Sequence, residues 1–229
     1  MHFFKFNSEK LRIKSLIIRV TKLFLLILLS GFCLSLTTAI HRLVVFVYDG
    51  DTILLDGGDS VRYIGIDTPE IDHQNGKHDF MAQAARDFNI KLVKGARVKI
   101  EGDHERKDQY GRRLAYVFLE NGDMVNAILV KKGLAHVMLK TPNVKYKTEL
   151  LDCQREAMKK RLGIWSRSPA TAEKYYLGNK NSYRFHRPTC PFGRKVSKKN
   201  IVRFQSRNDA FWEGYSPCSH CLSAGRAER

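Results

Sequence analysis

The sequence predicts a mainly β domain with helices (β+α), followed by a small module stabilised by a metal or a disulfide. Five short runs rich in β-branched and aromatic residues lie between residues 42 and 119, as expected of strands. Three segments carry apolar residues at helical spacing, and three of the five cysteines lie after residue 176. A length of 229 residues and a hydrophobic content of 43% suit one medium domain plus a small one.

The first 39 residues have the layout of a secretory signal peptide. Residues 1–22 are basic and polar, residues 23–36 are apolar and uncharged, and Thr37 and Ala39 stand at positions −3 and −1 of the expected cleavage site. We therefore predict a signal peptide over residues 1–39, cleavage near Ala39, and a secreted or periplasmic protein. The apolar run is shorter than the roughly 20 residues of a spanning helix. Because the basic region before it is long, an uncleaved membrane anchor is the alternative.

Five strands are expected within residues 40–167. In order, they are Arg42–Tyr48, Thr52–Leu55, Val61–Ile66, Arg97–Glu101 and Leu114–Leu119. A turn rich in Gly and Asp separates the second strand from the third, so these two form a hairpin. The first three strands then make a meander.

Three helices complete this domain, at Phe80–Val93, Val125–Lys132 and Lys145–Arg161. A glycine follows each of them, which is typical of helix ends. The resulting order is three strands, a helix, two strands and two helices. This order is compatible with an OB-type barrel, a fold that often binds nucleic acid.

Acidic residues lie at both open ends of the predicted hairpin. Asp51 precedes its first strand, and Asp67 and Glu70 follow its second. Because the strands are antiparallel, these three residues are expected at the same end of the sheet, together with Arg62. Oxygen ligands suit a hard cation such as Ca²⁺ or Mg²⁺, and an arginine suits a phosphate.

The chain is strongly basic, with a formal charge of +17. Without residues 1–39 the charge is still +12, from 34 basic and 22 acidic residues. Such a charge favours a polyanionic partner such as nucleic acid. Solubility or adhesion to an anionic surface is the simpler explanation of the same charge.

Several short motifs in residues 42–166 resemble the staphylococcal nuclease (thermonuclease) family. They are Asp49–Thr52, Arg62 followed by Asp67–Glu70, Asp108–Arg112, Met124–Asn126, Gly133–Ala135 and Gly163–Ser166. Their order and spacing together make the resemblance specific. It implies a five-stranded OB-fold barrel with three helices. The implied activity is Ca²⁺-dependent hydrolysis of phosphodiester bonds, with DNA and RNA as substrates. We infer no obligate protein partner.

The resemblance also implies the metal ligands. Asp51 and Asp67 correspond to the carboxylates that hold one Ca²⁺, and Thr68 corresponds to a ligand that binds through its backbone carbonyl. Such a cation offsets the negative charge of a phosphodiester and polarises a non-bridging oxygen.

Four further residues take roles in catalysis and substrate binding by the same resemblance. Glu70 corresponds to the residue that assists the attacking water. Arg62 and Arg112 correspond to the guanidiniums that stabilise a phosphorane-like transition state, and Tyr110 to a further phosphate contact. The alternative is a non-catalytic nucleic-acid-binding OB module. Because such modules usually lack the acidic and arginine residues, their presence favours an enzyme.

The sequence departs from the family pattern in two places. The stretch Val137–Thr141 contains no aromatic residue where the family's type member has aromatics beside the substrate base. Gln109 replaces a basic residue. Both departures concern how the substrate is held, and neither touches the predicted metal ligands or guanidiniums.

Residues 168–175 are predicted as a linker, and residues 176–229 as a separate Cys/His module. Its spacing, His186-x₃-Cys190 with Cys218-x₂-Cys221, suits a tetrahedral Zn²⁺ site. His220 is a competing ligand. This region resembles the metal domain of Ada-type DNA repair proteins. Because exported cysteines often oxidise, a disulfide between Cys190 and either Cys218 or Cys221 is the alternative.

Overall fold

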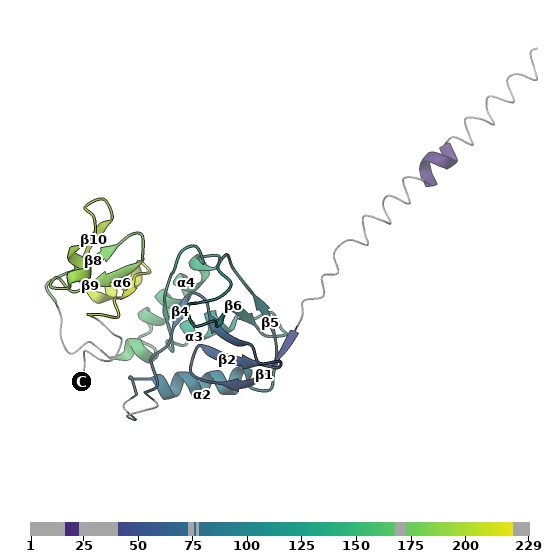
Figure 1. Ribbon diagram of the computed structural model, residues 1–229, viewed down its shortest axis with the longest axis horizontal. Helices are drawn as coiled ribbons and strands as arrows, with labels where there is room; N and C mark the ends of the chain where they lie inside the picture. The colour runs from purple at the N-terminus through teal and green to yellow at the C-terminus, as the bar shows by residue number, and fades with distance from the viewer. Residues whose placement is uncertain (1–16, 23–40, 73–75, 77, 168–172, 222–229) are drawn as a thin grey trace, which may run out of the picture. The chain divides into compact units, whose positions relative to one another are not determined.

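The computed structural model describes residues 17–22, 41–72, 76, 78–167 and 173–221 (Figure 1). The chain divides into two compact units, residues 1–39 and 40–229. Of the predicted signal peptide, only residues 17–22 are described, and they are helical. The apolar run and the expected cleavage position lie outside the described residues. In the described part of the chain, no helix combines the length and apolar character needed to cross a bilayer.

Five strands close into a barrel, as the sequence predicts. Their order is β1 (His41–Val47), β2 (Thr52–Leu55), β3 (Ser60–Tyr63), β6 (Arg113–Phe118) and β5 (Arg97–Glu101), with β5 closing onto β1. All neighbouring strands are antiparallel except β3 and β6, which are parallel. Fully buried side chains from every strand, such as Val44, Ile53 and Val61, fill the barrel.

The third predicted strand, Val61–Ile66, is not continuous, so that prediction was wrong. The chain leaves the barrel after Tyr63 and turns at Gly65, whose φ is +79°. A short strand β4 (Ile66–Asp67) then pairs antiparallel with β7 (His136–Val137). This pairing sets Asp67 opposite His136 at the edge of the barrel.

Three helices accompany the barrel: α2 (Ala82–Val93), α3 (Val125–Lys131) and α4 (Lys147–Lys159). Helix α2 begins two residues later than predicted, because Met81 before it adopts a left-handed φ of 68°. Helices α3 and α4 pack against each other, and α4 buries Leu150 and Leu151 in the barrel core. A short 3₁₀ helix, η1 (Gly163–Ser166), follows α4.

The C-terminal module contains a small four-stranded sheet and two short helices. The strand order is β10 (Ile201–Phe204), β8 (Tyr176–Asn179), β9 (Arg184–His186) and β11 (Ser216–Pro217), and the helices are α5 (Pro191–Arg194) and α6 (Arg207–Trp212). Buried aromatic residues, among them Tyr176, Phe185 and Phe211, form its own core. Of the predicted linker, the described residues 173–175 have no regular structure.

Helix α4 connects the barrel to this module through a buried side chain. Gln154 is fully buried, and its Oε1 accepts a hydrogen bond from Val137 N at 2.6 Å. Its Nε2 donates to the carbonyl oxygen of Phe211 on α6 at 2.5 Å. Trp165 of η1 also packs edge-on against Phe211, with ring centroids 5.0 Å apart. The hydrophobic core of the module therefore includes contacts with residues of α4 and η1, which belong to the barrel domain.

Candidate active site and metal centre

Asp51 lies in the turn between β1 and β2 and is only 4% exposed. Its Oδ2 accepts hydrogen bonds from Thr68 N at 2.8 Å and from Thr68 Oγ1 at 3.0 Å. A Cβ on the neighbouring Gly50 would lie 2.6 Å from the Thr68 side chain. The glycine at this position therefore permits the close approach that joins Asp51 to Thr68. Asp49 shapes the same turn, because its Oδ1 accepts from Asp51 N.

Arg62 lies between the two predicted metal carboxylates. It belongs to β3, opposite Thr52 of β2, and its side chain is 10% exposed. One guanidinium nitrogen contacts Asp51 Oδ1, and Nη2 contacts Asp67 Oδ1 at 2.5 Å. The structure thus brings Asp51, Arg62 and Asp67 together, as the hairpin pattern predicts, and Thr68, which the family resemblance adds, joins them.

Glu70 follows this cluster and is exposed. Its backbone is held in a reciprocal pair with Asp79: Glu70 N donates to the Asp79 carboxylate, and Asp79 N donates to the Glu70 carbonyl. Partial burial raises the pKa of Glu70, and the nearby Asp67 and Asp49 carboxylates raise it further, whereas Arg62 lowers it. A carboxylate with a raised pKa is a better proton acceptor than an ordinary surface glutamate.

Arg112 reaches the same region from the loop before β6. Because β6 runs parallel to β3 with Arg113 opposite Val61, the loop emerges beside the start of β3, where Gly58 and Asp59 line one pocket with Arg112. The charge of Arg112 lowers the pKa of Asp49, whose burial raises it on balance. The two predicted guanidiniums therefore act on one acidic cluster.

Asp108 shapes the loop that carries Tyr110 and Arg112. Its Oδ1 accepts from the backbone N–H groups of both residues, and its Oδ2 accepts from Arg112 Nε at 2.7 Å. Burial opposes the ionisation of Asp108, but these hydrogen bonds lower its pKa on balance. Tyr110 is 74% exposed, and the Arg112 guanidinium lies 5.3 Å from its ring centroid. Both side chains are available to a ligand.

The acidic cluster has the chemistry of a hard-cation site. Its donors are carboxylate, hydroxyl and backbone oxygens, which Ca²⁺ prefers. The carboxylates of Asp49, Asp51, Asp67 and Glu70 outnumber the guanidiniums of Arg62 and Arg112. A divalent cation would offset this excess of negative charge. The predicted ligands Asp51, Asp67 and Thr68 therefore fit a bound Ca²⁺.

His136 contacts the site, although the sequence pattern did not single it out. It is 4% exposed, and its Nε2 lies 3.8 Å from Asp67 Oδ2. Burial lowers its pKa to about 4 despite the Asp67 carboxylate, so the ring is neutral at ordinary pH. Its other contact is the ring of Phe211 in the module, 5.4 Å away. The pairing of β4 with β7, which creates these contacts, could not be read from two-residue strands.

The stretch Val137–Thr141 provides no base-stacking surface. Val137 and Leu139 are fully buried in the barrel core, at 0% and 1% exposure. These two side chains therefore contribute to the barrel core and cannot stack on a substrate base.

The predicted zinc ligands of the module form one cluster. The ligand atoms of His186, Cys190, Cys218 and Cys221 all lie within 4.8 Å of one another. Strand β11 runs parallel to β9, and Cys218 N donates to Phe185 O, which carries Cys218 to His186. The cysteines in the described residues are all free thiols. The competing ligand His220 is exposed, packs on Phe192 and lies outside the cluster.

The surroundings of the sulfur atoms fit a metal centre. Arg187 N points at Cys221 Sγ at 3.4 Å, and backbone N–H groups of Gly193 and Phe192 point at Cys190. These donors lower the pKa of Cys190 on balance, although burial opposes them. Burial and the neighbouring sulfurs raise the pKa of Cys221 to about 12. A bound cation would stabilise both thiolates, and a Cys₃His set suits tetrahedral Zn²⁺.

Comparison with protein families gives two matches. The model described as staphylococcal nuclease homologue matches residues 60–167, and that described as the metal binding domain of Ada matches residues 161–223. The first match contains Asp67 and Glu70 of the acidic cluster together with Arg62 and Arg112, but it begins after Asp49 and Asp51. The second contains the four clustered ligands of the module.

Individual relatives agree with the first match. A thermonuclease of Staphylococcus intermedius is 46% identical over 128 residues, covering 55% of this chain and 76% of the relative. A thermonuclease of Staphylococcus hyicus is 39% identical over 126 residues, covering 54% and 74%. Endonuclease YncB of Bacillus subtilis is 37% identical over 135 residues, covering 57% and 64%. With this barrel, this cluster and these relatives, the chain belongs to the staphylococcal nuclease family.

Proposed function

We propose that the protein is an exported, Ca²⁺-dependent nuclease that cleaves phosphodiester bonds of DNA and RNA. Membership of a family whose relatives include thermonucleases and an endonuclease makes it a phosphodiester hydrolase. The observation that carries the proposal is the position of Arg62. This buried guanidinium is held between Asp51 and Asp67, and its charge acts on Glu70 and, together with that of Arg112, on Asp49.

In this proposal, Asp51, Asp67 and the backbone carbonyl of Thr68 would hold the cation. When bound, Ca²⁺ supplies charge neutralisation and polarises a non-bridging phosphate oxygen. The chain prepares these ligands in advance, because Thr68 fixes the orientation of the Asp51 carboxylate through two hydrogen bonds.

The remaining residues act on the phosphate and on the water. Arg62 and Arg112 offer forked donors whose hydrogen bonds strengthen as charge builds on the phosphoryl oxygens. Tyr110, which lies on the same loop as Arg112 and is exposed, adds a further contact with the phosphate. Glu70 accepts a proton from the attacking water, a role supported by its raised pKa.

The signal-like segment supports export. Its basic start, apolar run and small residues before Ala39 are typical of a signal for export, after which the protein would be either free through cleavage or anchored without it. N-terminal sequencing of the protein recovered from the medium or periplasm tests this. A mature chain that starts far from residue 40 would contradict cleavage near Ala39.

Nuclease assays on DNA and RNA, with Ca²⁺, with Mg²⁺ or with no added divalent cation, test the mechanism. We expect activity with Ca²⁺ and little without a divalent cation. Glu70→Gln and Arg112→Ala should each lower kcat, with a loss of about 10²–10³ for the missing donor. Lys94→Gln, at an exposed position beyond α2, serves as the matched surface control. Full activity of the Glu70 or Arg112 variant would reject the assigned roles.

We further propose that His186, Cys190, Cys218 and Cys221 bind one Zn²⁺. Metal analysis of the purified protein should find zinc at about one atom per chain, and Cys218→Ser should reduce that content. A cation held by thiolates contributes directly to folding, so the same variant should destabilise the module. Protein without zinc, whose thiols react only after reduction, would instead indicate the disulfide.

A further inference from the structure

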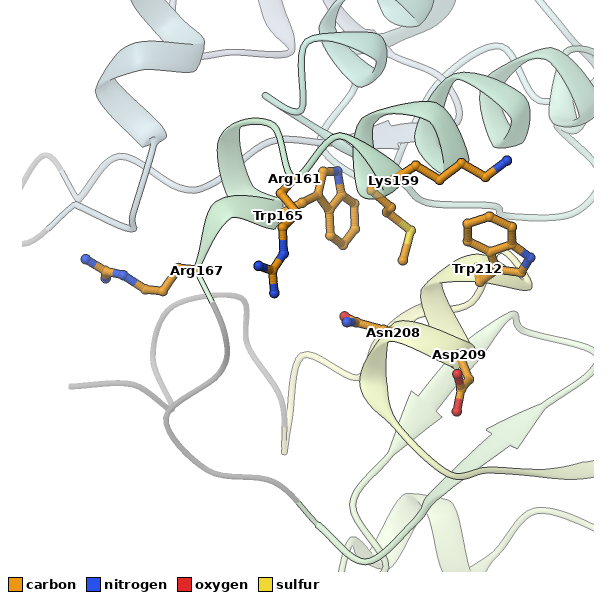
Figure 2. A pocket seen from close by; sticks show the side chains of 8 residues that line it. Lys159, Arg161, Trp165, Arg167, Asn208, Asp209 and Trp212 are labelled. Atoms are coloured by element: carbon orange, nitrogen blue, oxygen red, sulfur yellow. The ribbon is translucent and has the colours of Figure 1, made fainter.

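A cavity of about 270 Å³ lies where the end of α4 and η1 meet α6, away from the residues of the candidate active site (Figure 2). Trp165 and Arg161 line it from one side, and Trp212 and Asn208 from the other. Its volume is close to the lower end of the range typical of ligand sites, about 300–1,000 Å³. It therefore suits a ligand the size of a nucleotide.

Both tryptophans of the chain line this single cavity. Trp165 is held in place by its edge-on contact with Phe211. Trp212 is only partly buried, and Arg155 Nε donates to its carbonyl oxygen at 3.1 Å. The Arg155 guanidinium also lies 5.6 Å from the centroid of the Trp212 ring. A partly exposed indole is a suitable surface for stacking a base.

Three cationic side chains, Lys159, Arg161 and Arg167, line the cavity. Lys159 Nζ lies 5.5 Å from the Trp212 ring, and Arg161 makes no ion pair with any described residue. In Figure 2 the Arg161 side chain extends from the end of α4 toward α6. Asp209, the one acid of the lining, is already engaged in a capping box with Ser206. The unpaired charge of the cavity is therefore positive.

We propose that this cavity is an accessory binding site for single-stranded nucleic acid. One base of the strand stacks on Trp212, and the adjacent phosphates contact Lys159 and Arg161. Alternating aromatic and cationic groups are the common means of holding single strands without sequence preference. The inference rests on the nucleic-acid chemistry of the proposed function, but it assigns a site that is separate from the acidic cluster.

A duplex does not fit this description. Its bases are paired and stacked, so a base must be unstacked before it can reach Trp212, at a cost of a few kcal/mol. The duplex phosphates still attract Lys159 and Arg161. Single and double strands of equal length therefore separate stacking in the cavity from simple attraction of charge.

Binding of a dT 12-mer to the full chain tests the site. The Glu70→Gln protein without added Ca²⁺ serves as the parent, so that the strand stays intact. We expect the 12-mer to quench the tryptophan emission, and a 12-bp duplex to quench it far less. Equal quenching by both, or none by the 12-mer, would overturn the proposal.

Substitutions in the same parent locate the contact, with affinity measured by the anisotropy of a labelled 12-mer. Trp212→Ala should weaken binding by about 5- to 150-fold, the equivalent of one stacked base. Arg161→Asn suits the left-handed φ of 54° at this position. It should reduce the slope of log K against log salt by about 0.7. Lys94→Gln, an exposed lysine outside the cavity lining, should change the affinity little.

The outcomes separate this inference from the proposed function. If wild-type protein cleaves DNA with Ca²⁺ but Trp212→Ala and Arg161→Asn bind the 12-mer as tightly as the parent, only the accessory site is rejected. If the 12-mer quenches emission and both variants bind weakly but wild-type protein hydrolyses no nucleic acid, the accessory site stands and the proposed activity is rejected.

Discussion

At the residue scale, hydrogen bonds to Asp108 hold the Arg112 side chain in its orientation. Asp108 accepts from two backbone N–H groups of its loop and from the Arg112 guanidinium. We predict that Asp108→Ala lowers nuclease activity by about 10- to 100-fold, because a misplacement of 1 Å at a reacting group can cost about 10². Asp108→Asn should recover part of the activity, since its amide oxygen can still accept from the backbone. Steady-state kinetics on DNA measure both variants.

Asp87→Asn is the matched control for these variants. Asp87 is exposed on α2, and its carboxylate accepts from Gln83 at 2.8 Å. Its substitution should leave the rate within about twofold, as surface changes usually have small effects. An Asp108→Ala protein with the rate of Asp87→Asn would show that Arg112 finds its position without this carboxylate.

A second prediction at this scale concerns two glycines in contact. Gly163, the first residue of η1, and Gly133 after α3 lie so close that a Cβ on Gly163 would overlap the carbonyl oxygen of Gly133. Ile164 N also donates to that carbonyl at 2.8 Å. Gly163→Ala should therefore lower the free energy of unfolding by roughly 1–3 kcal/mol through the clash alone, in line with overpacked sites.

Gly122→Ala is the control that lacks this clash. The urea midpoint of unfolding is measured for both variants. Gly122 also has a positive φ, of 89°, but nothing lies within 4 Å of the position of its Cβ. Both variants bear the strain of a left-handed alanine, about 1–2 kcal/mol, and only Gly163→Ala adds the overlap. Equal midpoints for the two variants would contradict the argument.

The residue scale also shows what a pattern can and cannot predict about a site. Asp51, Arg62 and Asp67 could be grouped from sequence, because a hairpin brings its two open ends together and the motif gives the spacing. His136 could not, since it enters the site through a strand pair of two residues. Asp108 was quoted within a motif, but its role depends on three hydrogen bonds that spacing does not encode.

At the element scale, the five strands of the barrel follow their β-branched and aromatic runs, but one strand end does not. Val61–Ile66 has the composition of a single strand, and Gly65 divides it. Without that turn, Asp67 would continue along the barrel wall. Instead it lies on β4, beside β7. Gly65 thus determines the position of Asp67, a predicted metal ligand. The strand propensity of the sequence gives little indication of this turn, because the residues on both sides of Gly65 favour a strand.

The connection between β5 and the start of α4 gives a pH dependence. Glu101 at the end of β5 accepts from Lys145 Nζ at 2.5 Å and from Tyr146 OH at 2.8 Å. Burial opposes its ionisation, but these hydrogen bonds lower its pKa on balance. An acid with a lowered folded-state pKa stabilises the protein above its unfolded pKa of about 4.3, and this stability is lost as the pH falls through the folded pKa.

We therefore predict that Glu101→Gln is less stable than wild type at pH 7, and that the difference shrinks as the pH falls below about 4. Urea midpoints at pH 7, 5 and 3 measure this. Glu120→Gln, at an exposed turn, is the control and should follow wild type at each pH. A constant difference between Glu101→Gln and wild type down to pH 3 would exclude the linkage to ionisation.

At the scale of the whole molecule, residues 40–229 contain two cores that share α4. The sequence indicates two parts. The nuclease motifs all lie before residue 167, and three of the five cysteines, which belong to the predicted zinc site, all lie after residue 176. The sequence gives no indication of the contact between the two parts. Phe211 packs on His136, which lies beside Asp67, so the module reaches a predicted metal ligand through two side chains. Such contacts depend on how α6 lies on α4, which local pattern does not determine.

Gln154 tests how far the two parts depend on each other. It joins Val137 N in the barrel to Phe211 O in the module, and it is fully buried. Gln154→Leu keeps a similar shape but leaves both backbone groups without this partner, at a cost of about 1–3 kcal/mol for each unsatisfied group. Because the lost bonds span two cores, we expect the variant to unfold earlier in urea. The change should be visible in tryptophan emission, since Trp165 packs on Phe211.

The same substitution on an exposed surface provides the comparison. Gln83→Leu, on α2, loses only a hydrogen bond to Asp87 and should change the urea midpoint little. If Gln154→Leu lowers both the urea midpoint followed by tryptophan emission and the nuclease activity, the stability of the active site depends on the module, through the contacts of α4, Phe211 and His136. If the midpoint matches that of Gln83→Leu, the two cores are stable independently, and Gln154 serves only to fill the space between them.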